Sequence, residues 1–310
     1  MDIVFFGSSR FAVEPLNKLL SSENKIVCVV TQPDQKQGRG LKLSFTPIKE
    51  MAIKNNLNFY QPQDLASSKT IDFLKKLSAD LFVVVAYGKI LPQKLLDVPK
   101  IFAINLHASL LPKYRGAAPI NWAIIKGEKE TGISIIKMNQ YMDAGEIILQ
   151  KKIPIDNTDT NITLSQKLSH LGSEMLLEAI DLIANNKYNL VPQDEAVVSF
   201  APLLKKEDGL IDWKKPARDI YNLIRGCLVW PGAFTHYKNK ILKIWEAVVN
   251  HQMVSEAEPG TIINLSKEGI LVKTGQQNLL IIKLQLESGK AMSAYDFLQG
   301  HKLNIGDKFI

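Results

Sequence analysis

Three polar residues lie where predicted strands of this 310-residue chain end. Asn105 and His107 are two positions apart at the end of an apolar run, and Asp143 follows the run Thr131–Lys137. Alternate residues of a strand point to the same face, so Asn105 and His107 are predicted to share one. Asn and His can donate hydrogen bonds to an oxyanion, and an Asp can orient an imidazole and favour its charged form. The three residues therefore suit acyl transfer.

Each of these residues also has a purely structural interpretation. A histidine at a strand end can be satisfied by a backbone carbonyl beneath a loop. An aspartate before a small-residue turn can open a hairpin. The chain has no G-x-S-x-G element that would present a nucleophile. Its absence favours direct transfer between two substrates over a covalent acyl-enzyme.

Strand and helix signals alternate over the first 190 residues. Short apolar runs predict strands at Ile3–Phe6, Ile26–Thr31, Leu81–Ala86 and Ile101–Leu106, and helix-period segments lie between them at Val13–Leu20, Pro47–Asn55 and Ile71–Leu77. Near-continuously apolar strands separated by helices are typical of a parallel sheet covered on both faces, with ligands at the carboxyl ends of its strands. We predict an α/β fold in which residues 1–190 form a Rossmann-like open parallel sheet. The runs at 131–137 and 147–155 extend it, and a helix follows over 164–185.

The pattern changes after a stretch rich in proline and polar residues. Residues 191–206 are predicted to be a linker. A helix over 218–227 is followed by short β-type runs at Ala233–Tyr237, Ile241–Val249, Gly260–Asn264, Gly269–Thr274 and Leu279–Leu286. Short, closely spaced strands of this kind predict that residues 207–310 form a small OB-like β-barrel.

The composition is that of an ordinary globular protein, 46% hydrophobic and 22% charged. Cys28 and Cys227 have no C-x-x-C partner, so neither a disulfide framework nor a metal is expected. No run approaches the ~20 apolar residues of a membrane span, and no basic leader precedes an apolar segment. We expect a cytoplasmic monomer that does not associate with membranes. A formal charge of +7 is compatible with a polyanionic partner.

The strand-end residues and their surroundings resemble the signature of the folate-dependent formyltransferases. The run Ser109-Leu110-Leu111-Pro112 follows the Asn105-x-His107 element directly, and Asp143-Ala144-Gly145 supplies a downstream D-x-G. In that family the Asn–His–Asp trio is catalytic. The resemblance implies that Ser109, Leu110, Leu111 and Pro112 line the site for 10-formyltetrahydrofolate. It also implies that the backbone of Ala86–Leu91, with Tyr87, Gly88 and Ile90, contacts the pterin.

Within this family, the chain is most similar to members that formylate methionyl-tRNA, over nearly its whole length. The matching runs are Val84–Gly88, Arg115–Ile120, Ile211–Trp213, Trp230–Ala233 and Gly289–Ala294. The resemblance implies a catalytic N-terminal domain, a C-terminal domain that holds RNA, and initiator methionyl-tRNA as the partner. The turn Gly7–Phe11 keeps the glycine and phenylalanine of the family's pattern but not its Thr-Pro-acidic centre. With one glycine where G-x-G-x-x-G needs three, no dinucleotide site is predicted.

A basic loop at Gln32–Leu43 interrupts the alternation of strands and helices. Arg39 lies between two glycines and is flanked by Lys36 and Lys42. Such a loop is either ordinary solvated chain or a cationic finger suited to phosphates. The resemblance favours the finger, because methionyl-tRNA-specific members reach the tRNA acceptor stem with a similar insertion. The lysines of the second domain (Lys205, Lys206, Lys214, Lys215, Lys238, Lys240 and Lys243) are either solubilising or RNA-binding, and the resemblance again favours binding.

The predicted reaction is transfer of the formyl group of 10-formyltetrahydrofolate to the α-amine of methionyl initiator tRNA, by direct attack through a tetrahedral intermediate. An amino-sugar nucleotide formyltransferase, which shares the two-domain layout, is the alternative within the class. The loop around Arg39 and the run Arg115–Pro119 argue against it. A non-enzymatic RNA-binding protein on a relict transferase domain would tolerate loss of the strand-end trio, yet all three residues are present.

Overall fold

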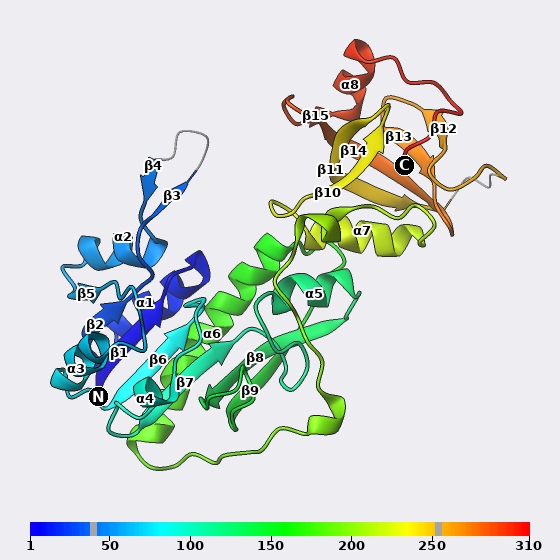
Figure 1. Ribbon diagram of the computed structural model, residues 1–310. Coiled ribbons are helices and arrows are strands. Elements are labelled where there is room, and N and C mark those ends of the chain that lie inside the picture. The colour runs from blue at the N-terminus through cyan, green and yellow to red at the C-terminus, as the bar shows by residue number, and fades with distance from the viewer. Residues whose placement is uncertain (38–41, 252–255) are drawn as a thin grey trace. The chain divides into compact units, whose positions relative to one another are not determined.

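The computed structural model describes residues 1–37, 42–251 and 256–310. The chain forms two compact units (Figure 1). The first unit comprises residues 1–119, 130–154 and 165–202, and the second comprises residues 120–129, 155–164 and 203–310. The chain therefore passes between the units several times, and their division is not a single cut along the sequence.

A mixed sheet forms the centre of the first unit, with the strand order β5-β2-β1-β6-β7-β8-β9 among the described residues. Its strands are β1 (Asp2–Gly7), β2 (Lys25–Val30), β5 (Phe59–Tyr60), β6 (Leu81–Val85), β7 (Phe102–His107), β8 (Glu130–Lys137) and β9 (Ile147–Pro154). Pairing is parallel from β5 through β7. Strand β8 runs antiparallel to β7, and β9 antiparallel to β8. The predicted parallel sheet is confirmed, and its extension is an antiparallel hairpin.

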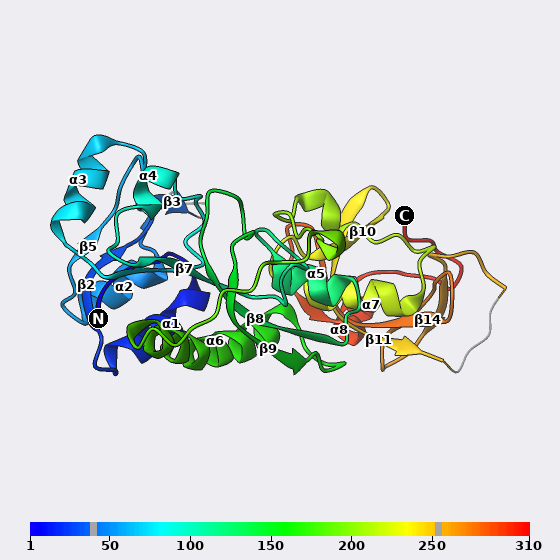
Figure 2. The same ribbon diagram turned by 90° about the horizontal axis from the view of Figure 1, so that it is seen from below.

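Helices cover both faces of this sheet (Figure 2). They are α1 (Val13–Leu20), α2 (Pro47–Lys54), α3 (Ser68–Lys76), α4 (Gln93–Leu96) and α6 (Asn161–Ala184), the last of which begins in the second unit. On one face, Phe6 and Phe82 pack in a core that includes Leu74 of α3 and Leu95 of α4. On the other face, Gly172 of α6 lies so close to Leu106 that an added Cβ would be 2.9 Å from a leucine methyl carbon. The side chain of Leu106 thus points toward α6, and its neighbours Asn105 and His107 point away from it.

Local sequence explains where several of these elements begin. Thr46 accepts a hydrogen bond from the backbone N–H of Lys49, and Pro47 occupies the first turn of α2. The predicted basic loop contains a short antiparallel ladder of β3 (Gln35–Gln37) and β4 (Lys42–Ser44). Arg39 lies outside the described residues.

The second unit is built on an antiparallel sheet with the order β10-β11-β14-β13-β12, and β15 pairs with β14. These strands are β10 (Ala233–Tyr237), β11 (Lys240–Asn250), β12 (Ile262–Leu265), β13 (Ile270–Lys273), β14 (Asn278–Leu286) and β15 (Met292–Ser293). The C-terminal segment closes the sheet. Ile310 exchanges two backbone hydrogen bonds with His236 of β10, and the N–H of Ile262 in β12 donates to the carbonyl of Asp307. The predicted small β-barrel is confirmed.

The α-helices α5 (Pro119–Ile125), α7 (Ala217–Gly226) and α8 (Ala294–Gly300) belong wholly or mainly to the second unit. The core of this unit contains Trp213, Phe297 and Phe309. The indole N–H of Trp213 donates to Thr235 Oγ1 at 2.9 Å, which satisfies its one donor inside the core. Within the described parts of the chain, no helix combines the length and hydrophobicity that spanning a bilayer requires.

Candidate active site

The three polar residues predicted to act together meet at one edge of the first unit's sheet. Asn105 and His107 lie at the end of β7, and Asp143 lies in the connection between β8 and β9. The amide of Asn105 donates to Asp143 Oδ1 at 3.2 Å, and His107 Nδ1 is 3.5 Å from Asp143 Oδ2. The side chains of His107 and Asp143 are only 6% and 13% exposed, so water screens their interaction incompletely.

The imidazole of His107 has an oxygen atom beside each ring nitrogen. Nε2 is 3.0 Å from the backbone carbonyl of Tyr114. A carbonyl only accepts, so Nε2 carries the hydrogen in this contact and Nδ1 faces the carboxylate of Asp143. The structural interpretation of His107 predicted a backbone carbonyl beside the ring, and the catalytic interpretation predicted the carboxylate of Asp143. The structure has both groups beside the ring.

Backbone conformation holds the carboxylate of Asp143 in place. Asp143 adopts a left-handed conformation with φ of 52°, which Asp tolerates better than most residues. Its Oδ2 accepts the backbone N–H of Gly116 at 2.9 Å. Gly116 has φ of 127°, and a Cβ there would be 2.6 Å from the carbonyl oxygen of Ala201. Only glycine can bring its N–H to Asp143 in this conformation.

Residues of β8 and β9 position the loop that carries the run Ser109–Pro112. Ser109 is fully buried, and its hydroxyl donates to the carbonyl of Lys113 at 2.6 Å. Ser134 on β8 donates to the carbonyl of Ser109 and accepts the N–H of Leu111. Leu111 is buried, whereas Leu110 and Pro112 are half-buried. Contact between this loop and a folate stays a prediction.

The Ala86–Leu91 segment follows β6, the neighbour of β7. Val84 is paired with Asn105, so this segment leaves the sheet at the same edge as the Asn–His–Asp trio, where α/β proteins bind ligands. The carbonyl of Tyr87 accepts the side-chain amide of Gln32 at 2.6 Å, and burial raises the pKa of the Tyr87 phenol to about 12. Gly88 has φ of 82°, and Ile90 is 68% exposed. Contact with the pterin stays a prediction.

Two of the three residues predicted to bind tRNA lie on the paired strands β3 and β4. Lys36 lies on β3 and Lys42 on β4, while Arg39 is outside the described residues. At the base of the hairpin, Asp34 pairs with Lys49 and accepts the amide of Gln61 at 2.8 Å. These hydrogen bonds, that of Lys49 first, lower the pKa of the Asp34 carboxyl. The role of the hairpin in binding RNA stays a prediction.

Residues 1–180 match the family model described as formyl transferase, and residues 203–302 match that of the formyl transferase C-terminal domain. The chain belongs to the formyl transferase family. It is 44% identical to the methionyl-tRNA formyltransferase of Alkaliphilus oremlandii and 42% identical to that of Clostridioides difficile, and each match covers 99% of both chains.

Solved structures similar to this chain include two with TM-scores of 0.67. HypX from Aquifex aeolicus is 17% identical, and the match covers 98% of this chain and 49% of HypX. The chain thus spans about half the length of HypX. The sugar 3N-formyl transferase WlaRD is 20% identical, and the match covers 94% of this chain and 99% of WlaRD. At these identities the likeness shows the fold alone.

Sequence reasoning missed one residue that holds the turn of Asp143. The side-chain amide of Gln193 donates to the carbonyls of Asp143 and Gly145. Gln193 lies in the stretch predicted to be a linker, and nothing in its sequence context points to the Asp143 turn. Arg115, which binds Gln193, was noticed only as part of a matching run.

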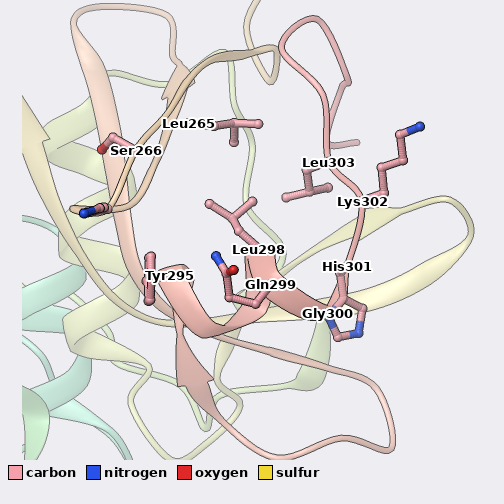
Figure 3. A pocket seen from close by; sticks show the side chains of 10 residues that line it. Leu265, Ser266, Tyr295, Leu298, Gln299, Gly300, His301, Lys302 and Leu303 are labelled. Atoms are coloured by element: carbon pink, nitrogen blue, oxygen red, sulfur yellow. The ribbon is translucent and has the colours of Figure 1, made fainter.

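A separate hollow lies in the second unit, between the β12–β13 turn, α8 and the segment after α8 (Figure 3). Its lining includes Lys267, Tyr295, His301 and Lys302, and none of the predicted catalytic or folate-binding residues. Over the described ranges of the chain, no group of three or more His, Cys, Asp and Glu side chains could hold a metal ion.

Proposed function

We propose that this chain transfers the formyl group of 10-formyltetrahydrofolate to the α-amino group of methionine on initiator tRNA. The observation that carries the proposal is its identity of 42–44%, over 99% of its length, to enzymes named methionyl-tRNA formyltransferase. HypX was solved in complex with tetrahydrofolic acid, which supports a folate-derived formyl donor for a fold of this kind. A tRNA acceptor is consistent with a cytoplasmic enzyme.

In the proposed reaction, the amine of methionine attacks the formyl carbon and converts its carbonyl oxygen into an oxyanion. Asn105 Nδ2 carries two N–H donors, and the hydrogen bond to Asp143 uses one of them. The second N–H of Asn105 stabilises the oxyanion together with the Nε2–H of His107, which exchanges the carbonyl of Tyr114 for the oxyanion when the substrates bind. Donors that are oriented in advance at such an atom typically contribute ~10²–10³ in rate.

Collapse of the tetrahedral intermediate breaks the bond between the formyl carbon and N10 of the folate. The attacking amine loses a proton as N10 gains one. Asp143 orients the imidazole of His107 and helps to move this proton through water. The enzyme forms no covalent bond to the formyl group, so the reaction needs no nucleophilic side chain. Positioning of both substrates makes the step effectively unimolecular.

The second unit is proposed to hold the tRNA. Barrels of this kind bind oligonucleotides through basic faces and aromatic stacking. The predicted RNA-binding lysines begin at Lys205 and continue into the barrel. The hollow lined by Lys267, Lys302 and Tyr295 offers two cationic side chains and an aromatic ring on one open surface.

The experiment that tests this function compares acceptors. Purified protein is incubated with 10-formyltetrahydrofolate labelled in the formyl group, and label is measured on initiator methionyl-tRNA, uncharged tRNA and a dTDP-amino sugar. We expect label on methionyl-tRNA and none on uncharged tRNA, which lacks the α-amine. Label on the amino sugar with none on methionyl-tRNA would overturn the proposal in favour of the sugar nucleotide alternative.

A further inference from the structure

The turn that carries Asp143 is held by a side chain from a distant part of the chain. Gln193 Nε2 donates to the carbonyl oxygens of Asp143 at 2.8 Å and of Gly145 at 2.7 Å. Both N–H groups of the amide are therefore used on the two carbonyls that flank Ala144. Residues 143 and 193 are 50 positions apart, so only the folded chain brings them together.

Arg115 determines which way this amide points. Its Nε and Nη2 donate to Gln193 Oε1 at 3.0 and 2.8 Å. If the amide were reversed, its nitrogen would face the guanidinium and its oxygen would face two carbonyls, so every contact would be repulsive. The side chain of Arg115 is only 7% exposed, and its backbone N–H donates to Ser199 at 2.9 Å.

The same short segment also contacts the carboxylate of Asp143. Gly116, the next residue after Arg115, donates its N–H to Asp143 Oδ2. Gln193, held by Arg115, thus fixes the backbone of the turn, and the N–H of Gly116 fixes the carboxylate of Asp143. A non-glycine residue at a positive φ persists only where its surroundings determine it, and Asp143 is such a residue.

We infer that Arg115 and Gln193 are positioning residues that aim the carboxylate of Asp143 at His107 and Asn105. This inference rests on the proposed function, because it takes Asp143 to act in formyl transfer. The side chains of the pair make no hydrogen bond to His107 or Asn105, and they act through the backbone of the Asp143 turn. Displacement of a catalytic group by ~1 Å can lower turnover on the order of 10²-fold, so loss of this support should appear in kcat.

Glu195 provides a matched control, because it is the other partner of Arg115. Its carboxylate accepts from Arg115 at 2.7 and 3.2 Å but does not contact the Asp143 turn. The Arg115 guanidinium lowers the pKa of Glu195. The Glu195 side chain is 71% exposed, and in a Glu195→Gln variant the amide oxygen can still accept a hydrogen bond from Arg115.

The test measures kcat, KM for each substrate and thermal unfolding in the full-length protein. Gln193→Glu keeps an oxygen for Arg115 but replaces both amide donors by an oxygen that faces two carbonyls. We expect kcat to fall about 10- to 100-fold with KM changed less than about threefold. Arg115→Lys keeps the positive charge but loses the paired hydrogen bonds to Gln193 Oε1, and it should lower kcat less than Gln193→Glu does. Glu195→Gln should leave kcat unchanged.

A double-mutant cycle with Asp143→Asn shows whether Gln193 acts through Asp143. In the Asp143→Asn background, Gln193→Glu should lower kcat less than about threefold further, because the carboxylate that it positions is already absent. Equal losses in both backgrounds, or wild-type kcat in Gln193→Glu, would overturn the positioning role. If Gln193→Glu fails to fold, Arg115→Lys carries the same cycle. Wild-type turnover in Asp143→Asn alone would instead overturn the catalytic assignment of Asp143.

Discussion

Replacement of Ser134 by alanine should loosen the loop that carries the run Ser109–Pro112. Ser134 is fully buried on β8, and its hydroxyl makes three hydrogen bonds. It donates to the carbonyl of Ser109 at 2.7 Å and accepts from the N–H of Leu111 at 3.1 Å and from the amide of Gln150 at 2.8 Å. One oxygen atom thus connects β8, β9 and the loop.

The size of the effect follows from what each partner loses. Ser109 and Leu111 are 0% and 3% exposed, so water cannot readily replace the hydroxyl at either backbone group. An unsatisfied buried polar group costs about 1–3 kcal/mol, which gives roughly 2–6 kcal/mol for the two. Gln150 adds little, because its amide still donates to the carbonyl of Leu111. At about 2–4 °C per kcal/mol, we expect the Tm to fall by roughly 4–24 °C.

Thermal unfolding of the full-length variant checks this expectation, and Ser173→Ala is the matched control. Ser173 is also buried, but its hydroxyl donates to the carbonyl of His170 in the same helix. A back-bond of this kind contributes little to helix stability, so the Tm of the control should change by no more than a few degrees. If Ser134→Ala lowers the Tm no more than Ser173→Ala does, the hydroxyl of Ser134 does not hold the loop.

Three further predictions concern the site and the core. His107→Ala should lower turnover ~10²–10³-fold with nearly unchanged Tm, and wild-type turnover would exclude it from catalysis. Gly116→Ala should lower the free energy of unfolding by about 1–3 kcal/mol, because its φ is 127° and its added Cβ would meet a carbonyl oxygen. Gly300→Ala, where nothing lies within 4 Å of the added Cβ, is the control. Burial raises the pKa of Cys28 and Cys227 to about 12, so at pH 8 neither thiol should react with a disulfide reagent until the protein is unfolded.

Apolar periodicity predicted most of the regular elements. The ranges Val13–Leu20 and Ala233–Tyr237 agree with α1 and β10 at both ends. Ser21 follows the first range, and Gly232 and Lys238 bound the second. Helix α6 begins at Asn161, three residues before the predicted start. Asn161 and Thr163 are polar, and Ile162 between them is 42% exposed, so these residues do not continue the buried apolar face of the helix. The β3–β4 hairpin was predicted as a loop, since its glutamines and lysines do not alternate with apolar residues.

The sequence by itself determined which residues stand at the ends of strands and which faces they share. Asn105 and His107 are two apart on a strand, and a period of two puts them on one face without reference to any other part of the chain. The resemblance to formyltransferases also rested on residues close together in sequence, in the runs around His107 and Asp143.

Only the tertiary structure decided what each of these residues contacts. Asp143 meets Asn105 because β8 returns antiparallel along β7, a direction that apolar periodicity does not specify. Gln193 reaches the Asp143 turn from a segment without helix or strand pattern. Gly116 donates its N–H to Asp143 in a conformation with positive φ, in which the carbonyl of Ala201 leaves no room for a Cβ. These contacts join residues 27 to 50 positions apart. Their formation depends on packing of the whole sheet, and local sequence patterns do not predict that packing.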